Sequence, residues 1–153
     1  MSRARFPRAD MVVLCRPEQA RDQLPLTTDT VAVVMTHNYR SDLQLLELLL
    51  PSPARYVGLL GPKKRSRRLL RELDAAGIHV TAAQRRRLHA PIGLDIGAET
   101  SEEIGLAIVA EIRAVLAGRA GSPLRERRIP IHERVQSDEN QLTQMLVVAE
   151  CTS

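Results

Sequence analysis

Two short, uninterrupted runs of aliphatic residues are the clearest feature of the hydrophobic pattern. Residues 30–36 and 55–60 are rich in valine and leucine, and neither run alternates between apolar and polar positions. A strand that is apolar throughout is buried on both faces, which is typical of a parallel sheet covered by helices. Residues 11–15 form a third apolar run and predict another buried strand, which ends at Arg16 and Pro17.

Apolar residues recur at helical spacing after each of the two longer runs. A leucine-rich helix is predicted over residues 43–50, with Ser41 as its N-cap and Pro51 as its stop. A second helix is predicted to start at Pro62 and to end at Gly77, with leucines on one face and basic residues on the other.

Residues 100–118 give the strongest helix prediction. Thr100 and Glu103 have the spacing of a capping box, and isoleucine and valine then recur at helical spacing until Gly118. Residues 81–88 predict only one or two helical turns, whereas residues 142–149 fit either a strand or a helix. The order of these elements predicts an α/β fold with an open, mostly parallel sheet flanked by helices.

Residues 89–98 form a loop of unusual composition between two helical segments. Its apolar residues alternate at positions 92, 94 and 96, which predicts that the loop is pinned to the core. Gly93 and Gly97 permit backbone conformations closed to other residues, and His89 and Asp95 are then expected to face a cleft. The alternative is a plain connection whose glycines only satisfy turn geometry.

The ends of the two strands form a candidate binding site, because ligands of open parallel sheets bind beyond the carboxyl ends of the strands. A helix that starts there offers backbone N–H groups and positive charge to a phosphate or pyrophosphate. The alternative is a solvated basic face on an ordinary helix. The residues concerned are Thr36, His37 and Asn38 after the first strand, and Gly61, Pro62, Lys63, Lys64 and Arg65 after the second.

The chemical roles of the histidines stay open. His37 fits a general base, a metal ligand or a simple hydrogen-bonding residue, but no second His or Cys at ligand spacing supports a metal site. His89 and Asp95 could form an acid/base pair, although such residues more often serve structure. The chain has no G-x-G-x-x-G turn, P-loop or nucleophile elbow, so no sequence motif supports a dehydrogenase, kinase or hydrolase function.

Composition narrows the class of partner. The net charge of +4 and the Arg/Lys runs at residues 63–71, 85–87 and 125–128 favour anionic partners. Nucleic-acid binding by base stacking is disfavoured, because the chain has only 1 Phe and 2 Tyr. The 2 cysteines are far apart, which disfavours a disulfide, and no apolar run reaches the roughly 18 residues of a membrane span, so we expect a cytoplasmic protein.

Three stretches taken together closely resemble one family. VVMTHNYRSD at residues 33–42, YVGLLGPKKR at 56–65 and LHAPIGLDIGAET at 88–100 are similar to the Rossmann-like domain of the XdhC/CoxI family, the xanthine dehydrogenase accessory proteins. The resemblance covers residues 5–118 and implies a Rossmann-like sheet. We expect residues 119–153 to form a partly irregular C-terminal extension.

The resemblance implies a role in maturing molybdenum hydroxylases of the xanthine dehydrogenase type. It points to a cofactor-binding chaperone more than to an enzyme: one that binds the molybdenum cofactor (molybdopterin or its dinucleotide form), assists its sulfuration and inserts it into the apo-enzyme. Expected partners are that apo-enzyme, a cysteine desulfurase and further copies of the chain. The residues expected to bind the cofactor are Thr36, His37, Asn38, Gly61, Pro62, Lys63, Lys64, Arg65, His89, Gly93, Asp95 and Gly97.

The chain departs from the family at its front. Full-length relatives resemble a two-part protein, and their N-terminal domain, first Rossmann strand and Gly-rich turn have no counterpart before residue 5. We therefore expect an N-terminally truncated sheet, which is a fragment, a truncated copy or a protein whose sheet is completed by another chain. Two other functions stay open: a nicotinamide-dependent oxidoreductase and a non-catalytic, degenerate interaction module.

Overall fold

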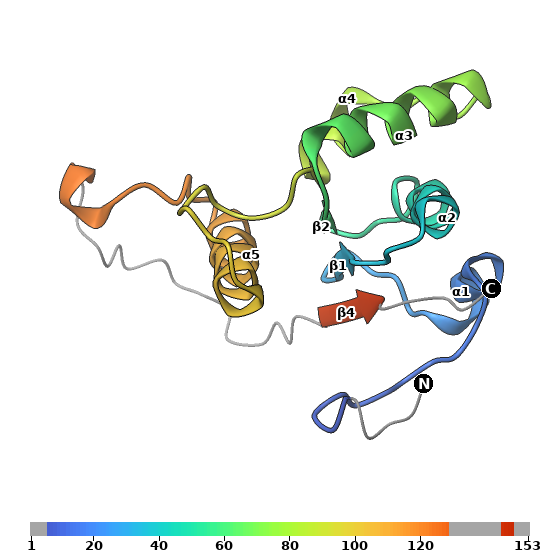
Figure 1. Cartoon of the computed structure of the whole chain (residues 1–153), viewed down its shortest axis with the longest axis horizontal. Helices are drawn as coiled ribbons and strands as arrows, with labels where there is room; N and C mark the ends of the chain where they lie inside the picture. The colour runs from blue at the N-terminus through green and yellow to red at the C-terminus, as the bar shows by residue number, and fades with distance from the viewer. Residues whose placement is uncertain (1–5, 129–144, 149–153) are drawn as a thin grey trace.

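The protein is built around a 4-stranded parallel sheet. The structure, a computed structural model, describes residues 6–128 and the strand at residues 145–148. The strands lie in the order β3-β2-β1-β4, and every pairing is parallel (Figure 1). The open parallel sheet is therefore confirmed. The strand bounds are Val31–Val34 for β1, Tyr56–Leu59 for β2, Leu88–His89 for β3 and Met145–Val148 for β4.

The helices agree well with the periodicity of the sequence. In α5, Thr100 and Glu103 form the predicted capping box, in which each side chain accepts a hydrogen bond from the other residue's backbone N–H. Thr81 and Gln84 form a second capping box at the start of α4. The bounds are Ala20–Gln23 for α1, Tyr39–Leu49 for α2, Lys63–Ala75 for α3, Ala82–Arg87 for α4 and Ser101–Leu116 for α5, with 3-10 turns at Pro17–Gln19 and Leu124–Glu126.

Each face of the sheet has its own hydrophobic core. Ala32 and Val34 of β1 pack with leucines of α2 and α3 on one face. Val31 and Val33 pack with isoleucines of α5 on the other face. Figure 1 shows this arrangement, with α2 and α3 on one side of the strands and α5 on the other. Burial on both faces explains why the strand sequences show no polar alternation.

The predicted strand at residues 11–15 is wrong. These residues are irregular, and the side chains of Met11 and Leu14 are 56% and 65% exposed. The segment pairs with no strand of the described sheet, so its backbone gains no ladder of hydrogen bonds. A short apolar run alone does not distinguish a buried strand from a connection.

The sequence left open whether residues 142–149 form a strand or a helix. Residues 145–148 form a strand, β4. This strand pairs with β1 along the edge that faces away from β2, with Val31 opposite Met145. Within the described sheet, that edge of β1 is therefore covered by the same chain. Most of the predicted extension at residues 119–153 lies outside the described residues.

Gly58 in the middle of β2 lets the loop after β3 approach the sheet. A Cβ atom at this position would lie 2.1 Å from Cδ1 of Ile92 and 2.9 Å from the ring of Tyr56. Ile92 itself is 8% exposed, and its backbone N–H donates to the carbonyl of Leu59. Glycine at residue 58 is thus required by packing rather than by backbone conformation.

We expect Gly58→Ala to lower the free energy of unfolding by about 1–3 kcal/mol, because the added methyl group displaces the Ile92 side chain from its packed position on the sheet. Urea denaturation followed by circular dichroism measures this change. Gly105→Ala is the matched control, since a Cβ there meets nothing within 4 Å. Alanine in the middle of α5 should raise stability by up to about 1 kcal/mol. Equal destabilisation by both variants would contradict the packing role of Gly58.

Candidate functional site

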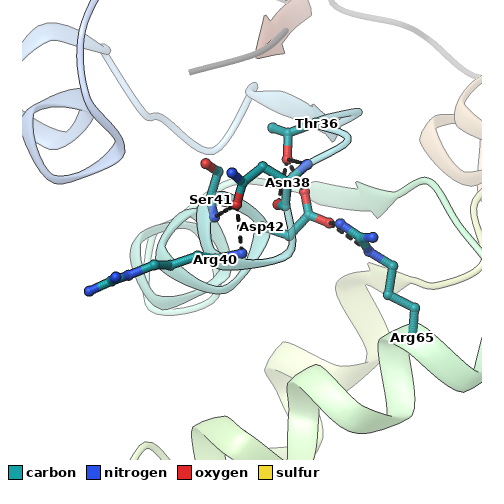
Figure 2. Close-up of polar contacts among 6 residues, drawn as sticks. All are labelled: Thr36, Asn38, Arg40, Ser41, Asp42 and Arg65. Carbon is teal, nitrogen blue, oxygen red and sulfur yellow. Dashed lines mark hydrogen bonds and ion pairs between the residues drawn. The ribbon is translucent and has the colours of Figure 1, made fainter. Parts of the chain in front are cut away.

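A buried carboxylate joins the end of β1 to α2 and α3. Asp42 in the first turn of α2 is 0% exposed. The hydroxyl of Thr36 contacts its Oδ1 atom, and the guanidinium of Arg65 binds its Oδ2 atom through Nε, at 2.9 Å, and through Nη2. Figure 2 shows these side chains converging from three segments of the chain. The carboxylate is therefore paired and hydrogen-bonded on both oxygens, as burial of a charge requires.

The helix α2 begins with a cap at Asn38, so the prediction of Ser41 as the N-cap is wrong. The side-chain oxygen of Asn38 accepts hydrogen bonds from the backbone N–H groups of Arg40, at 2.9 Å, and Ser41, at 3.1 Å (Figure 2). Asn is as good a capping residue as Ser, and here it lies directly before the first helical residue. The hydroxyl of Thr36 and the side-chain oxygen of Asn38 are both used within the protein.

The start of α3 keeps its backbone donors unbound by side chains. Its N-cap is Pro62, which supplies no side-chain hydrogen bond, and its first two residues are the exposed Lys63 and Lys64. Gly61 before it has φ of +130°, a conformation that other residues rarely adopt. The adjacent Leu60 N–H donates to the carbonyl of Val34, so this segment lies beside the end of β1. The structure thus brings the two predicted strand ends together.

Arg65 differs from the two lysines of the same segment. Its guanidinium binds Asp42, and its side chain is only 25% exposed. The ring of Tyr39 lies 5.6 Å from the guanidinium carbon of Arg65 and 4.8 Å from that of Arg68. Arg65 is therefore held in place from two sides, whereas Lys63 and Lys64 have no ion pair within the described part of the chain.

The loop at residues 89–98 is fixed at one end only. Ile92 is buried, whereas Ile96 is 51% exposed, so the predicted pinning of all three alternating residues is wrong at the last one. Gly93 donates its N–H to Glu111 of α5 at 2.9 Å. Asp95 and Gly97 are exposed. The backbone N–H of Leu94 still donates to the carbonyl of Ala107 in α5, and the loop turns outward after it, which explains the exposure of Ile96.

His89 and Asp95 do not form an acid/base pair. The imidazole of His89 stacks on the ring of Tyr56, with 4.3 Å between centroids, and its Nδ1 lies 3.4 Å from the carboxylate of Glu111. Asp95 makes no polar contact with any described residue. His89 is level with Val33 through the pairing of β1, β2 and β3, four residues before His37. His37 lies past the end of β1 at Val34, so the two histidines are not at the same level of the sheet.

Glu111 is a functional group that the sequence patterns did not single out. Its carboxylate accepts hydrogen bonds from the Tyr56 hydroxyl and the Gly93 N–H, and it lies beside His89. Burial, with the Glu111 hydrogen bond and charge, raises the pKa of the Tyr56 phenol. This cluster holds the loop at residues 89–98 against α5.

The role of His37, which the sequence left open, and the predicted cleft can be compared with the described residues. His37 is exposed, and no group of three His, Cys, Asp or Glu residues is arranged to hold a metal in the described part of the chain. Two hollows of the described surface are lined by residues outside the predicted set. Thr36, Asn38 and Arg65 lie together, with Gly61 to Lys64 beside them, whereas His89 and Gly93 belong to the α5 face.

The chain matches a known family over most of its length. A family model described as the XdhC Rossmann domain matches residues 2–112. The chain belongs to the XdhC Rossmann domain family. The family predicted from the three sequence stretches is therefore confirmed.

Two sequence relatives extend this comparison. The chain is 37% identical over 107 residues to a probable xanthine dehydrogenase subunit of Bacillus subtilis (strain 168), and the match covers 70% of this chain and 30% of that protein. It is 35% identical over 99 residues to the "Uncharacterized protein YqeB" of Escherichia coli (strain K12), covering 63% of this chain and 17% of that protein. The chain thus spans less than a third of the length of either relative.

A solved structure supports the fold of this XdhC-family chain. The crystal structure of a xanthine dehydrogenase from Bacillus halodurans matches with a TM-score of 0.66 and 32% identity, over 80% of this chain and 36% of that one. The Rossmann-like α/β fold is therefore confirmed. None of the helices that the structure describes has the length and hydrophobicity to cross a bilayer.

We expect Arg65→Met to lower the free energy of unfolding by about 3–5 kcal/mol, because it leaves the Asp42 carboxylate buried without a countercharge. Adding Asp42→Asn should recover most of this loss, since the neutral amide needs no cation. Denaturant titration of the two single variants and the double variant measures the coupling. Glu72→Gln, which breaks the exposed Arg68–Glu72 pair, is the control and should cost about 0.3–0.5 kcal/mol. Additive losses in the double variant would contradict the pairing.

We expect stability to fall with rising pH once the ordinary phenol pKa of about 10 is passed. The folded protein holds the Tyr56 proton more tightly than the unfolded chain does, because its pKa is raised. The stabilisation is therefore complete below about pH 10 and is lost progressively above it. Urea unfolding at a series of alkaline pH values measures this slope. Tyr56→Phe should make the slope shallower, and an unchanged slope would contradict the assignment.

Proposed function

We propose that this chain is an accessory protein for the maturation of a molybdenum hydroxylase of the xanthine dehydrogenase type. In this role it binds the molybdenum cofactor, assists its sulfuration and takes part in its insertion into the apo-enzyme. The proposal rests on the family membership and on a candidate site at the carboxyl edge of the sheet. The Bacillus relatives bear the names of a xanthine dehydrogenase and of a probable xanthine dehydrogenase subunit, which supports the choice of enzyme.

The observation that carries the proposal is the uncapped start of α3. Lys63 and Lys64 are exposed at the first turn of a 13-residue helix, and no side chain occupies its backbone donors. A helix N-terminus attracts anions through its free N–H groups and its dipole, and two lysines add positive charge. Gly61 keeps the backbone open in front of this turn. These features fit the phosphate or dinucleotide end of a pterin cofactor.

Residues next to this anchor are assigned to the remainder of the cofactor. His37 is exposed at the end of β1 and is available to a ligand. Thr36 and Arg65 act mainly by holding the two strand ends together through Asp42, and Asn38 acts by capping α2. Gly93, Asp95 and Gly97 would contact the cofactor only as part of the loop at residues 89–98. His89 would contribute indirectly, by supporting that loop. Lys63, Lys64 and His37 are therefore the principal ligand residues proposed.

The proposed partners follow from the same role. The apo-form of the hydroxylase receives the cofactor, and a cysteine desulfurase supplies the sulfur. A nicotinamide-dependent oxidoreductase is the competing function, and the absence of a G-x-G-x-x-G turn in the sequence argues against it. Titration with NADH distinguishes the two functions, because only the oxidoreductase should bind it.

We expect the double variant Lys63→Ala/Lys64→Ala to bind isolated molybdenum cofactor at least about tenfold more weakly than the wild type, because charge-assisted phosphate contacts are lost. Isothermal titration calorimetry measures the affinity. Arg21→Ala/Arg86→Ala is the control, since it removes two exposed cations away from the anchor. Unchanged affinity in the lysine variant would exclude the anchor, and no binding by the wild type would exclude the cofactor function.

A further inference from the structure

A basic groove runs between α3 and α4, on the part of the α3 surface that the proposed cofactor site does not use. Its volume is about 440 Å³. Figure 1 shows α3 and α4 side by side at the outer edge of the molecule. The groove is lined by Arg67, Leu70, Arg71, Asp74, His79, Val80 and Arg85.

Most of the basic residues of this region have no acidic partner. Of the cations between residues 63 and 87, Arg65 binds Asp42 and Arg68 binds Glu72. Arg87 donates to backbone carbonyls at the end of α2, including that of Leu50 at 3.1 Å. The others make no ion pair with any described residue: Lys63, Lys64, Arg67, Arg71, Arg85 and Arg86.

Three of these unpaired cations line the groove. Arg67 and Arg71 are one turn apart on α3, and Arg85 belongs to α4. Like charges at this spacing destabilise a helix, and a second helix that brings another cation to them adds to the repulsion. A bound anionic group would relieve it. The arrangement is thus favourable to a ligand and unfavourable without one.

The floor of the groove is apolar, which distinguishes it from an ordinary solvated face. Leu70 and Val80 are half-buried and pack against the core formed with α2. The exposed pair of Asp74 and His79, with Nδ1 and Oδ1 2.6 Å apart, lies on the same lining. An occupant that contacts the whole groove therefore combines negative charges with an apolar group.

We propose that this groove docks an acidic segment of a partner protein. Carboxylates of that segment bind Arg67, Arg71 and Arg85, and an apolar side chain between them packs on Leu70 and Val80. Nucleic acid fits less well, because no aromatic side chain lines the groove to stack with bases.

The groove is lined by other residues than those of the anion anchor at the start of α3. Its nearest lining residue, Arg67, comes 4 residues after Lys63, roughly 6 Å further along the helix axis. The variants that test the two sites therefore change different residues, and the docking function is tested apart from cofactor binding.

Fluorescence anisotropy with a labelled synthetic peptide tests the proposal. The probe is an acidic peptide with a central leucine, Gly-Glu-Glu-Leu-Glu-Glu-Gly, at low ionic strength, where charge interactions are least screened. The triple variant Arg67→Gln/Arg71→Gln/Arg85→Gln should bind it at least about fivefold more weakly than the wild type. The control Arg21→Gln/Arg86→Gln/Arg125→Gln removes the same charge outside the groove and should bind within about twofold of the wild type.

Further comparisons make each outcome decisive. A peptide with glutamine in place of every glutamate should bind neither protein, and Lys63→Ala/Lys64→Ala should bind the acidic peptide as the wild type does. Equal losses in the triple variant and its control would overturn the proposal in favour of general charge attraction. No binding by the wild type, or tighter binding of oligothymidylate through the same arginines, would also overturn it. Circular dichroism verifies that each variant is folded.

Discussion

The buried carboxylate of Asp42 is the constraint around which the carboxyl edge of the sheet is arranged. A charge removed from water is costly unless a countercharge and hydrogen bonds replace the solvent. Thr36 supplies the hydrogen bond from the end of β1, and Arg65 supplies the countercharge from α3. Meeting this requirement fixes where α3 begins relative to β1. The free N–H groups of α3 consequently lie beside the strand end rather than over open solvent.

Glu111 has a comparable role on the opposite face of the sheet. It gathers the Tyr56 hydroxyl, the Gly93 N–H and the imidazole of His89, which come from β2, the following loop and β3. Each face of the sheet therefore has one acidic residue that connects a helix to the strand ends. The hydrophobic cores hold the layers together, and these two carboxylates set the position of the irregular segments between them.

Local signals in the sequence predicted the two principal strands, the main helices and the capping box of α5, because these depend on neighbouring residues. The partners of Asp42 and Glu111 could not be predicted in this way, since Arg65 and Tyr56 are distant in sequence. Both acids nevertheless lie on apolar helix faces: Asp42 is one and two turns before Leu45 and Leu49. An acidic residue at a core position is a signal for a structural ion pair. The position of His89 depended instead on strand register, which periodicity does not reveal.

The pairing of β1 with β4 places the last described strand beside the first one in the chain, with Val31 opposite Met145. Contacts so distant in sequence form slowly, because a long stretch of chain must be closed into a loop first. Within the described residues, this late contact is what covers the edge of β1 that faces away from β2. Formation of the β1–β4 pair thus also protects that edge from pairing with another chain.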